Sequence, residues 1–212
     1  MALLHRADLT PTKLELLNAW LPTRSWYAGP AAPDVAKVGA FRFDDPAGEV
    51  GIETILVRAG DGPVLQVPLT YRGAPLDGAD RWLVGITEHS VLGTRWVYDA
   101  TGDPVYAAAL ARIILTAEPQ AAEEFEVDGV RQARPSDVQA NGSGHAGAAA
   151  PDATDILHVE DADPTRIATS SHELTVLRVL KDDAPTPPGA PTLTAAWGDV
   201  TTPRLLAYAT AR

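Results

Sequence analysis

The 212-residue sequence contains no cysteine, which excludes disulfides, thiolate metal sites and cysteine nucleophiles. It also lacks a long apolar run. Within the first 25 residues Asp8, Lys13 and Glu15 interrupt the only candidate for the apolar core of a signal peptide. No later stretch is long enough for a transmembrane helix. We therefore expect a cytoplasmic protein.

Positive charge is scarce as well. The chain has 17 Lys and Arg against 28 Asp and Glu, giving a formal net charge of −11. Such a surface repels phosphate backbones and anionic lipid headgroups, which argues against nucleic-acid and membrane partners. Hydrophobic residues make up 45 % of the chain, enough for one large domain or two small ones.

Two helices are predicted. In TPTKLELLNAWL, Thr10 can serve as the N-cap, Pro11 as the opening residue, and Pro22 ends the apolar stripe. In VYAAALARIILTA, apolar residues recur at helical spacing, and the segment is opened by Asp103 and Pro104.

Strands are predicted between these helices and again near the end of the chain. VAKVGAFRF, VGIETILVRA, VLQVPLTYR and DRWLVGITEHSVL are joined by short turn sequences, which favours an antiparallel meander. Residues 131–154 are rich in Ala, Gly, Ser and Pro and predict a flexible linker. The fold class is therefore α+β, with an α+β domain at 1–130, the linker, and a strand-rich tail at 155–212.

No catalytic or cofactor-binding motif stands out. The histidines have no zinc-site spacing, and Ser90 lies in no nucleophile elbow. The glycine groups GDGP and NGSG do not match a phosphate-binding loop, and the paired carboxylates lie in turns. We predict no catalytic residue, no metal and no cofactor.

Aromatic residues are only 6 % of the chain, yet they concentrate with charged residues in two clusters. The candidate interaction or sugar-stacking residues in these clusters are Arg24, Trp26, Tyr27, Arg95, Trp96, Tyr98 and Asp99. Two interpretations stay open. The rings can plug the ends of the sheet while the charges pair locally, or they can form a recognition surface for a protein or a sugar.

The first cluster lies in WLPTRSWYAG, residues 20–29, which resembles the segment that opens the N-terminal cap of actinobacterial maltokinases and related aminosugar kinases. The same segment occurs in trehalose synthase–maltokinase fusions. The matching residues are Trp20, Leu21, Pro22, Trp26, Tyr27, Ala28 and Gly29. Arg24 departs from the pattern, because the family usually places arginine directly before the second tryptophan, where Ser25 stands here. Together with HSVLGTRWVYDATGDPVYAAAL, the resemblance covers residues 10–116.

The resemblance implies a cap with a curved antiparallel sheet and flanking helices, followed by the strands of a nucleotide-binding intermediate subdomain. The tail segment SSHELTVLRVLKDDAPTPP is similar to those strands, which implies that Arg178 stands at the place of an ATP-contacting lysine. Arginine is a poor replacement there, since its wide fork does not reproduce a compact ammonium. Arg178 is therefore a possible degenerate nucleotide contact.

Kinases of this type also need a catalytic Asp and magnesium ligands, and the sequence has no H-x-D-x-x-x-x-N loop. We therefore expect a non-catalytic accessory or regulatory protein linked to maltose, trehalose and α-glucan metabolism. Its partner would be an enzyme of such a pathway or a second copy of the chain. Two alternatives stay open: a carbohydrate-binding module for α-glucans, and a residual ATP-binding lobe from a pseudokinase or split kinase.

Overall fold

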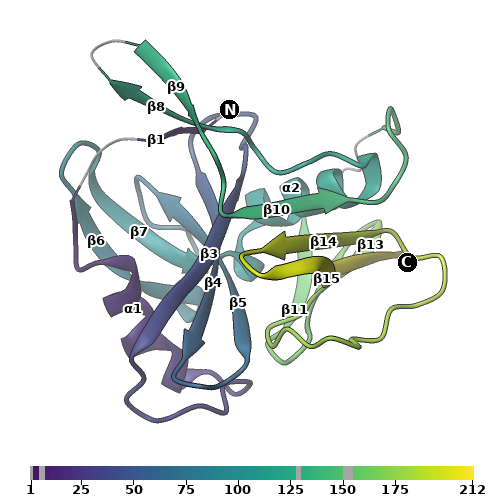
Figure 1. Ribbon diagram of the computed structural model, residues 1–212, viewed down its shortest axis with the longest axis horizontal. Coiled ribbons are helices and arrows are strands. Elements are labelled where there is room, and N and C mark those ends of the chain that lie inside the picture. Colours follow the sequence, from purple (N-terminus) through teal and green to yellow (C-terminus); the bar gives the residue numbers. More distant parts are fainter. Residues whose placement is uncertain (1, 5–7, 128–129, 150–154) are drawn as a thin grey trace.

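The computed structural model describes residues 2–4, 8–127, 130–149 and 155–212 (Figure 1). Its core consists of two six-stranded antiparallel sheets. The first sheet has the order β2 (Leu9–Thr10), β6 (Leu83–His89), β7 (Gly93–Asp99), β5 (Val64–Arg72), β4 (Gly51–Ala59) and β3 (Val35–Phe43). The second has the order β10 (Val138–Gly142), β14 (Thr192–Trp197), β15 (Val200–Ala211), β13 (His172–Val176), β12 (Thr165–Thr169) and β11 (Ile156–Glu160).

A small third sheet contains β1 (Ala2–Leu4), β8 (Glu123–Val127) and β9 (Val130–Arg134). The two α-helices are α1 (Lys13–Trp20) and α2 (Pro104–Thr116). The predicted α+β class with a mostly antiparallel sheet and flanking helices is confirmed. Within the part of the chain that the structure describes, no helix has the length and apolar character needed to cross a membrane.

The first sheet is not the meander predicted from its short connections. Strand β7 pairs with β5 and lies between β5 and β6, so chain order and spatial order differ. The prediction was wrong because residues 93–99 were interpreted only as an aromatic cluster, although they form a strand. A tight turn at Gly93, whose φ is +72°, folds β7 back on β6.

Helix α1 begins two residues later than predicted. Thr10 pairs with Glu88 in the sheet, and Thr12 is the N-cap instead. The Thr12 hydroxyl accepts from the backbone N–H of Glu15, whose carboxylate accepts from the backbone N–H of Thr12 at 2.7 Å. This capping box fixes the start of the helix. The buried side of α1, which includes Leu17, packs against the outer face of the first sheet.

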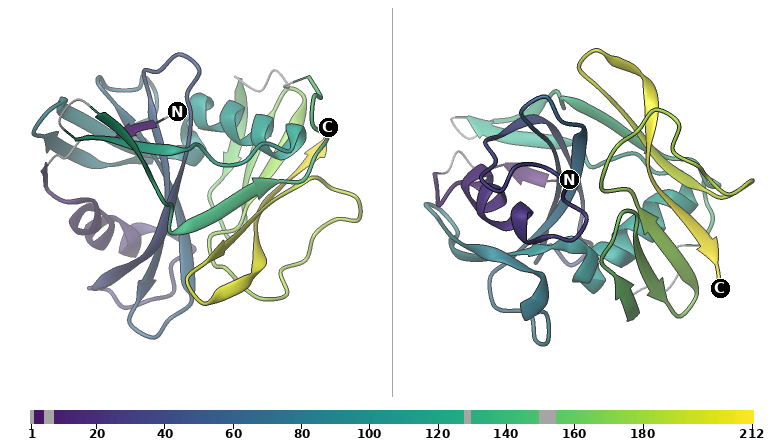
Figure 2. Two further views of the ribbon diagram at one scale, coloured as in Figure 1. Left: turned by 45° about the horizontal axis from the view of Figure 1, so that its top comes forward. Right: turned by 90° about the horizontal axis from the view of Figure 1, so that it is seen from below.

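Helix α2 begins where the sequence predicts it. The Asp103 carboxylate accepts from the backbone N–H of Val105 at 2.9 Å, and Pro104 occupies the first turn. The helix lies between the two sheets (Figure 2), and both Leu110 and Ile114 are completely buried there. It is apolar on almost every side because both of its faces are covered.

The core around α2 includes buried side chains from both large sheets, such as Phe41 of the first and Leu174 of the second. Buried residues on both sides of the predicted linker therefore share one hydrophobic core.

The predicted linker at 131–154 is ordered where the structure describes it. Residues 138–142 form β10, which pairs with β14. Beyond β10, the backbone N–H groups of Gly144 and His145 donate to the carbonyl oxygens of Ile114 and Leu115 at the end of α2, at 2.9 and 3.0 Å. A side chain on Gly144 would overlap this helix end. The small residues that suggested flexibility permit close backbone approach instead. Residues 150–154 lie outside the described residues.

Candidate functional site

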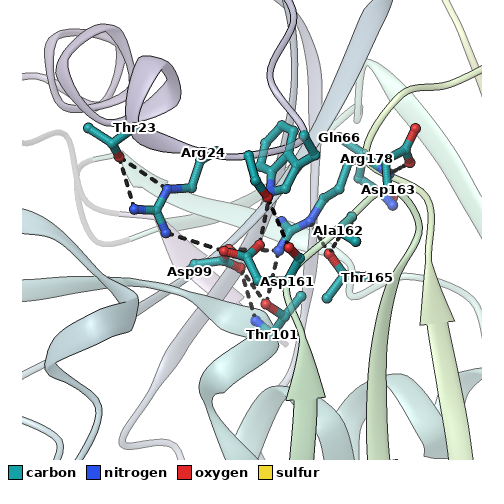
Figure 3. Close-up of polar contacts among 12 residues, drawn as sticks. Thr23, Arg24, Gln66, Asp99, Thr101, Asp161, Ala162, Asp163, Thr165 and Arg178 are labelled. Carbon is teal, nitrogen blue, oxygen red and sulfur yellow. Dashed lines mark hydrogen bonds and ion pairs between the residues drawn. The ribbon is translucent and has the colours of Figure 1, made fainter.

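Arg178, which follows β13, is the largest completely buried side chain among the described residues, and it lies between the two sheets (Figure 3). Its Nη2 donates to Asp99 Oδ2 at 2.7 Å and to Thr101 Oγ1 at 2.9 Å, and its Nε donates to Thr165 Oγ1 at 2.7 Å. Asp99 is completely buried as well. The guanidinium thus joins the end of β7 to β12.

The remaining nitrogen of Arg178, Nη1, has no hydrogen-bond partner, but the guanidinium lies over an aromatic face. Its Cζ is 4.9 Å from the ring centroid of Trp26. Trp26 meets Trp20 edge-on at 5.9 Å, and the guanidinium of Arg24 lies 5.0 Å from the Trp20 ring. Each of the two paired indoles therefore has a guanidinium beside it, Arg24 at Trp20 and Arg178 at Trp26. The negative electrostatic potential of the ring faces attracts these cations.

Asp161, directly after β11, anchors this stack from the other side. Its Oδ1 accepts from Trp26 Nε1 at 3.0 Å, and its Oδ2 lies 3.4 Å from Arg24 Nη1. Its backbone carbonyl accepts from the hydroxyl of Ser25 at 3.1 Å. Asp161 at the end of β11 therefore contacts three consecutive residues of WLPTRSWYAG, so this segment packs against the second sheet (Figure 3).

The backbone around Arg178 also joins the sheets. The carbonyl of Arg178 accepts from the backbone N–H of Gln66 in β5 at 2.8 Å. The side-chain amide of Gln66 donates to the carbonyls of Leu177 and Leu206 at 2.8 and 3.0 Å. The N–H of Leu180 donates to the carbonyl of Val64 at 2.9 Å. Residues 177–180 thus lie against β5 and are hydrogen-bonded along it.

A second polar cluster surrounds Glu53 on β4. Its carboxylate accepts from Lys13 Nζ at 2.5 Å and from the hydroxyl of Tyr71 at 2.8 Å, and it lies 3.2 Å from Arg42 Nη2. Burial by itself would raise the pKa of Glu53, but the two cations and the hydrogen bonds lower the pKa to about 2. Burial and the neighbouring carboxylate raise the pKa of Tyr71 well above its usual value. This cluster is internally compensated and holds α1 on the sheet.

Comparison with known families places this geometry in context. Residues 20–103 match the model of the maltokinase N-terminal cap domain. The matched region includes all of WLPTRSWYAG and strands β3 to β7, and the match ends at Asp103, the N-cap of α2. No curated protein matches the chain.

Several candidate residues of the cap lie inside it. The exposed fraction is 7 % for Trp26, 2 % for Tyr98 and 0 % for Asp99. The hydroxyl of Tyr98 accepts a hydrogen bond from the backbone N–H of Leu76 at 2.9 Å. These three side chains are buried in the fold, and Asp99 pairs with the distant Arg178 rather than with a charge nearby in the sequence.

The other candidates are partly exposed: Arg24, Tyr27, Arg95 and Trp96. Arg95 stands opposite Thr87 and Trp96 stands opposite Ile86 in the β6–β7 pairing. Adjacent residues of a strand point to opposite faces of a sheet, so Arg95 and Trp96 lie on different faces.

At the place of the expected nucleotide contact, Arg178 is 0 % exposed, and its guanidinium lies against Asp99 and the ring of Trp26. Its position within the apolar run LTVLRVL is the signal in the sequence, because an arginine buried among apolar residues needs a buried acceptor.

Asp161 was missed, because it was interpreted as a solvated turn carboxylate. Its partners lie about 135 residues earlier in the sequence, and nothing local to Asp161 reveals them.

Among the described residues, no group of three or more His, Asp or Glu side chains is placed to hold a metal ion. A surface hollow of about 340 Å³ lies beside the end of α2 and is lined in part by Arg112 and Glu118. These two side chains form an ion pair with each other. Their charges are therefore already compensated.

Proposed function

We propose that this protein is a non-catalytic accessory or regulatory protein, and that it binds an enzyme of maltose, trehalose or α-glucan metabolism. One observation carries the proposal. Arg178, at the position that the resemblance assigns to ATP contact, is used to lock the cap onto the second sheet through Asp99 and Trp26. The match of residues 20–103 to the maltokinase N-terminal cap model supports the metabolic link.

The carboxylates near the junction are engaged in the same structural way. Asp103 receives both Nε and Nη2 of Arg72 at 2.7 Å, in a bidentate pair. Asp161 contacts Arg24, and Asp163 accepts the backbone N–H of Arg178 at 2.9 Å. Phosphoryl transfer requires carboxylates that can hold magnesium and orient the acceptor hydroxyl. These aspartates are instead used to hold the fold together.

The exposed side chains favour a protein partner over a sugar. Stacking on sugar rings needs several accessible aromatic faces, and the indole of Trp26 is buried. The large apolar side chains that reach solvent are aliphatic: Ile86, Val91, Leu92 and Leu157. Aliphatic side chains contribute binding energy at protein interfaces through burial of their area.

The proposal is tested with the purified protein and a panel of purified maltokinases, trehalose synthases and α-glucan enzymes. We expect a saturable complex with at least one of them by light scattering coupled to size-exclusion chromatography. We also expect no change in melting temperature with ATP and magnesium, no phosphate transfer to maltose, and no heat with millimolar maltooligosaccharides. Stabilisation by ATP would favour the residual nucleotide-binding lobe, and heat with the oligosaccharides would favour the carbohydrate-binding module.

A further inference from the structure

Exposed apolar side chains gather at one place on the described surface. Ile86, Val91 and Leu92, exposed by 45, 56 and 45 %, all belong to the β6–β7 hairpin, and Ile86 stands opposite the half-buried Trp96. We call these four residues the hairpin patch. Residues at the tip of a hairpin are usually polar or glycine. Valine and leucine here leave about half of their side-chain surface exposed, so they bury little apolar area in the fold.

The tip of the hairpin is held in a defined shape. His89 Nδ1 accepts from the backbone N–H groups of Val91 and Leu92 at 3.2 and 3.1 Å. Ser90 exchanges two hydrogen bonds with the backbone of Asp8, each of 3.0 Å. The apolar side chains are therefore presented by a braced turn. Such preorganisation lowers the entropy cost of binding a partner.

The border of the hairpin patch is acidic. The carboxylates of Asp8 and Glu88 are exposed beside the tip, and Glu88 also accepts from the hydroxyl of Thr94 at 2.8 Å. The basic side chain in this hairpin, Arg95, stands opposite Thr87, on the other face of the sheet from Trp96. The net charge of −11 adds to this field. A partner with positive charge is therefore attracted.

A second copy of the chain fits this surface poorly. Two copies would bring the acidic borders of their hairpins together, and each carries a net charge of −11. The observations favour a different protein that supplies the opposite charge.

We propose that the hairpin patch is the docking surface for a partner protein that presents apolar side chains bordered by lysine or arginine. This inference rests on the proposed function, since it names the surface through which the accessory role is exerted. Val91 and Leu92 enter the apolar part of the partner, and Asp8 and Glu88 meet its cations. His89 positions the tip and need not touch the partner.

The test uses the full chain, labelled for NMR, and a matched pair of synthetic amphipathic helical peptides. One peptide carries leucine and lysine, and the other carries leucine and glutamate at the same positions. We expect amide shifts centred on Val91 and Leu92 with the lysine peptide. The double variant Val91→Ser/Leu92→Ser should raise its Kd at least tenfold, and the control Leu157→Ser should leave it unchanged. Both variants alter exposed residues, so folding should persist.

Shifts spread evenly over the acidic surface, or an equal Kd in the double variant, would overturn the inference. Binding of the glutamate peptide as tightly as the lysine peptide would also overturn the assigned charge. A pathway enzyme that binds the wild type and the double variant equally well would sink this inference and leave the proposed function intact. If the lysine peptide binds at the hairpin patch but no pathway enzyme binds the protein, this inference would stand and the proposed function would be rejected.

Discussion

The guanidinium of Arg178 and the carboxylate of Asp99 lie 2.7 Å apart, and neither side chain is accessible to solvent. Asp99 lies in the region that matches the maltokinase cap model, and Arg178 follows β13 of the second sheet. Removing two charges from water is costly, and their attraction offsets this cost only when further hydrogen bonds satisfy them. Thr101 and Thr165 supply such bonds here.

Replacing one member of this pair should therefore be severely destabilising. We expect Arg178→Met to lower the free energy of unfolding by about 3–5 kcal/mol, because Asp99 is then left buried and uncompensated. The double variant Arg178→Met/Asp99→Asn should recover part of the loss, since the uncompensated charge is removed. Urea denaturation followed by circular dichroism measures both. A loss below about 1 kcal/mol in the single variant would show that the pair is not buried in solution.

The hydrogen bond from Trp26 to Asp161 can be isolated with a conservative change. Trp26→Phe keeps an aromatic face under Arg178 but removes the indole N–H donor. We expect a loss of about 1.5–3 kcal/mol, the range for a hydrogen bond to a charged group. Trp96→Phe serves as the control, because the ring is partly exposed and should cost less. Equal losses would argue against docking of the segment on Asp161.

The Glu53 cluster predicts a specific acid response. The pKa of Glu53 is about 2 in the folded protein, against 4.5 for an ordinary glutamate. Because the folded pKa is depressed, the stabilisation is fully present above pH 4.5 and is lost as the pH falls toward 2. The full effect is about 3 kcal/mol. Urea titrations at pH 7, 4.5 and 3 should show this fall in the wild type and a shallower one in Glu53→Gln, and parallel pH profiles would contradict it.

The contact between residues 143–145 and the end of α2 predicts an unusual sensitivity to a single methyl group. Gly144→Ala should cost about 2–3 kcal/mol, because the added Cβ overlaps the backbone of Leu115 and forces the strand away from the helix. Gly147→Ala is the matched control. No atom lies within 4 Å of a Cβ at this position, and only its φ of +82° is unfavourable. If both variants unfold at the same urea concentration, this segment is not packed as described.

The brace in the hairpin is tested by hydrogen exchange. His89→Ala removes the acceptor for the N–H groups of Val91 and Leu92, and their amide exchange should accelerate at least tenfold. His89→Asn retains a side-chain acceptor close to the position of Nδ1 and should preserve most of the protection. Unchanged exchange in the alanine variant would mean that the turn is held without His89.

Local patterns in the sequence predicted much of the first sheet and both helices. The apolar periodicity of α2 and its cap at Asp103 are local features, and so are the turns that separate β3, β4 and β5. The family resemblance at WLPTRSWYAG was likewise sufficient to indicate the cap. Each of these signals involves residues that are close in sequence, and their physical causes are therefore visible without the fold.

The errors arose where a residue is explained by distant partners. The composition of residues 131–154 predicts a flexible linker. Only the contact with the end of α2 shows why glycine is needed at position 144. Asp161 resembles a solvated turn carboxylate until the cap brings Trp26 and Arg24 to it. Arg178 was assigned to a nucleotide by analogy, although a buried acceptor inside the chain satisfies it.

Because residues 177–180 are hydrogen-bonded along β5, we infer that the segment matched by the family model, residues 20–103, is not an independent folding unit in this protein. If residues 20–103 were excised, Trp26 would lose its acceptor Asp161 and Asp99 would lose its counter-ion Arg178. Val64 and Gln66 of β5 would also lose their backbone hydrogen bonds to residues 177–180. The boundary of the family match and the boundary of the folded core therefore fall at different places along this chain.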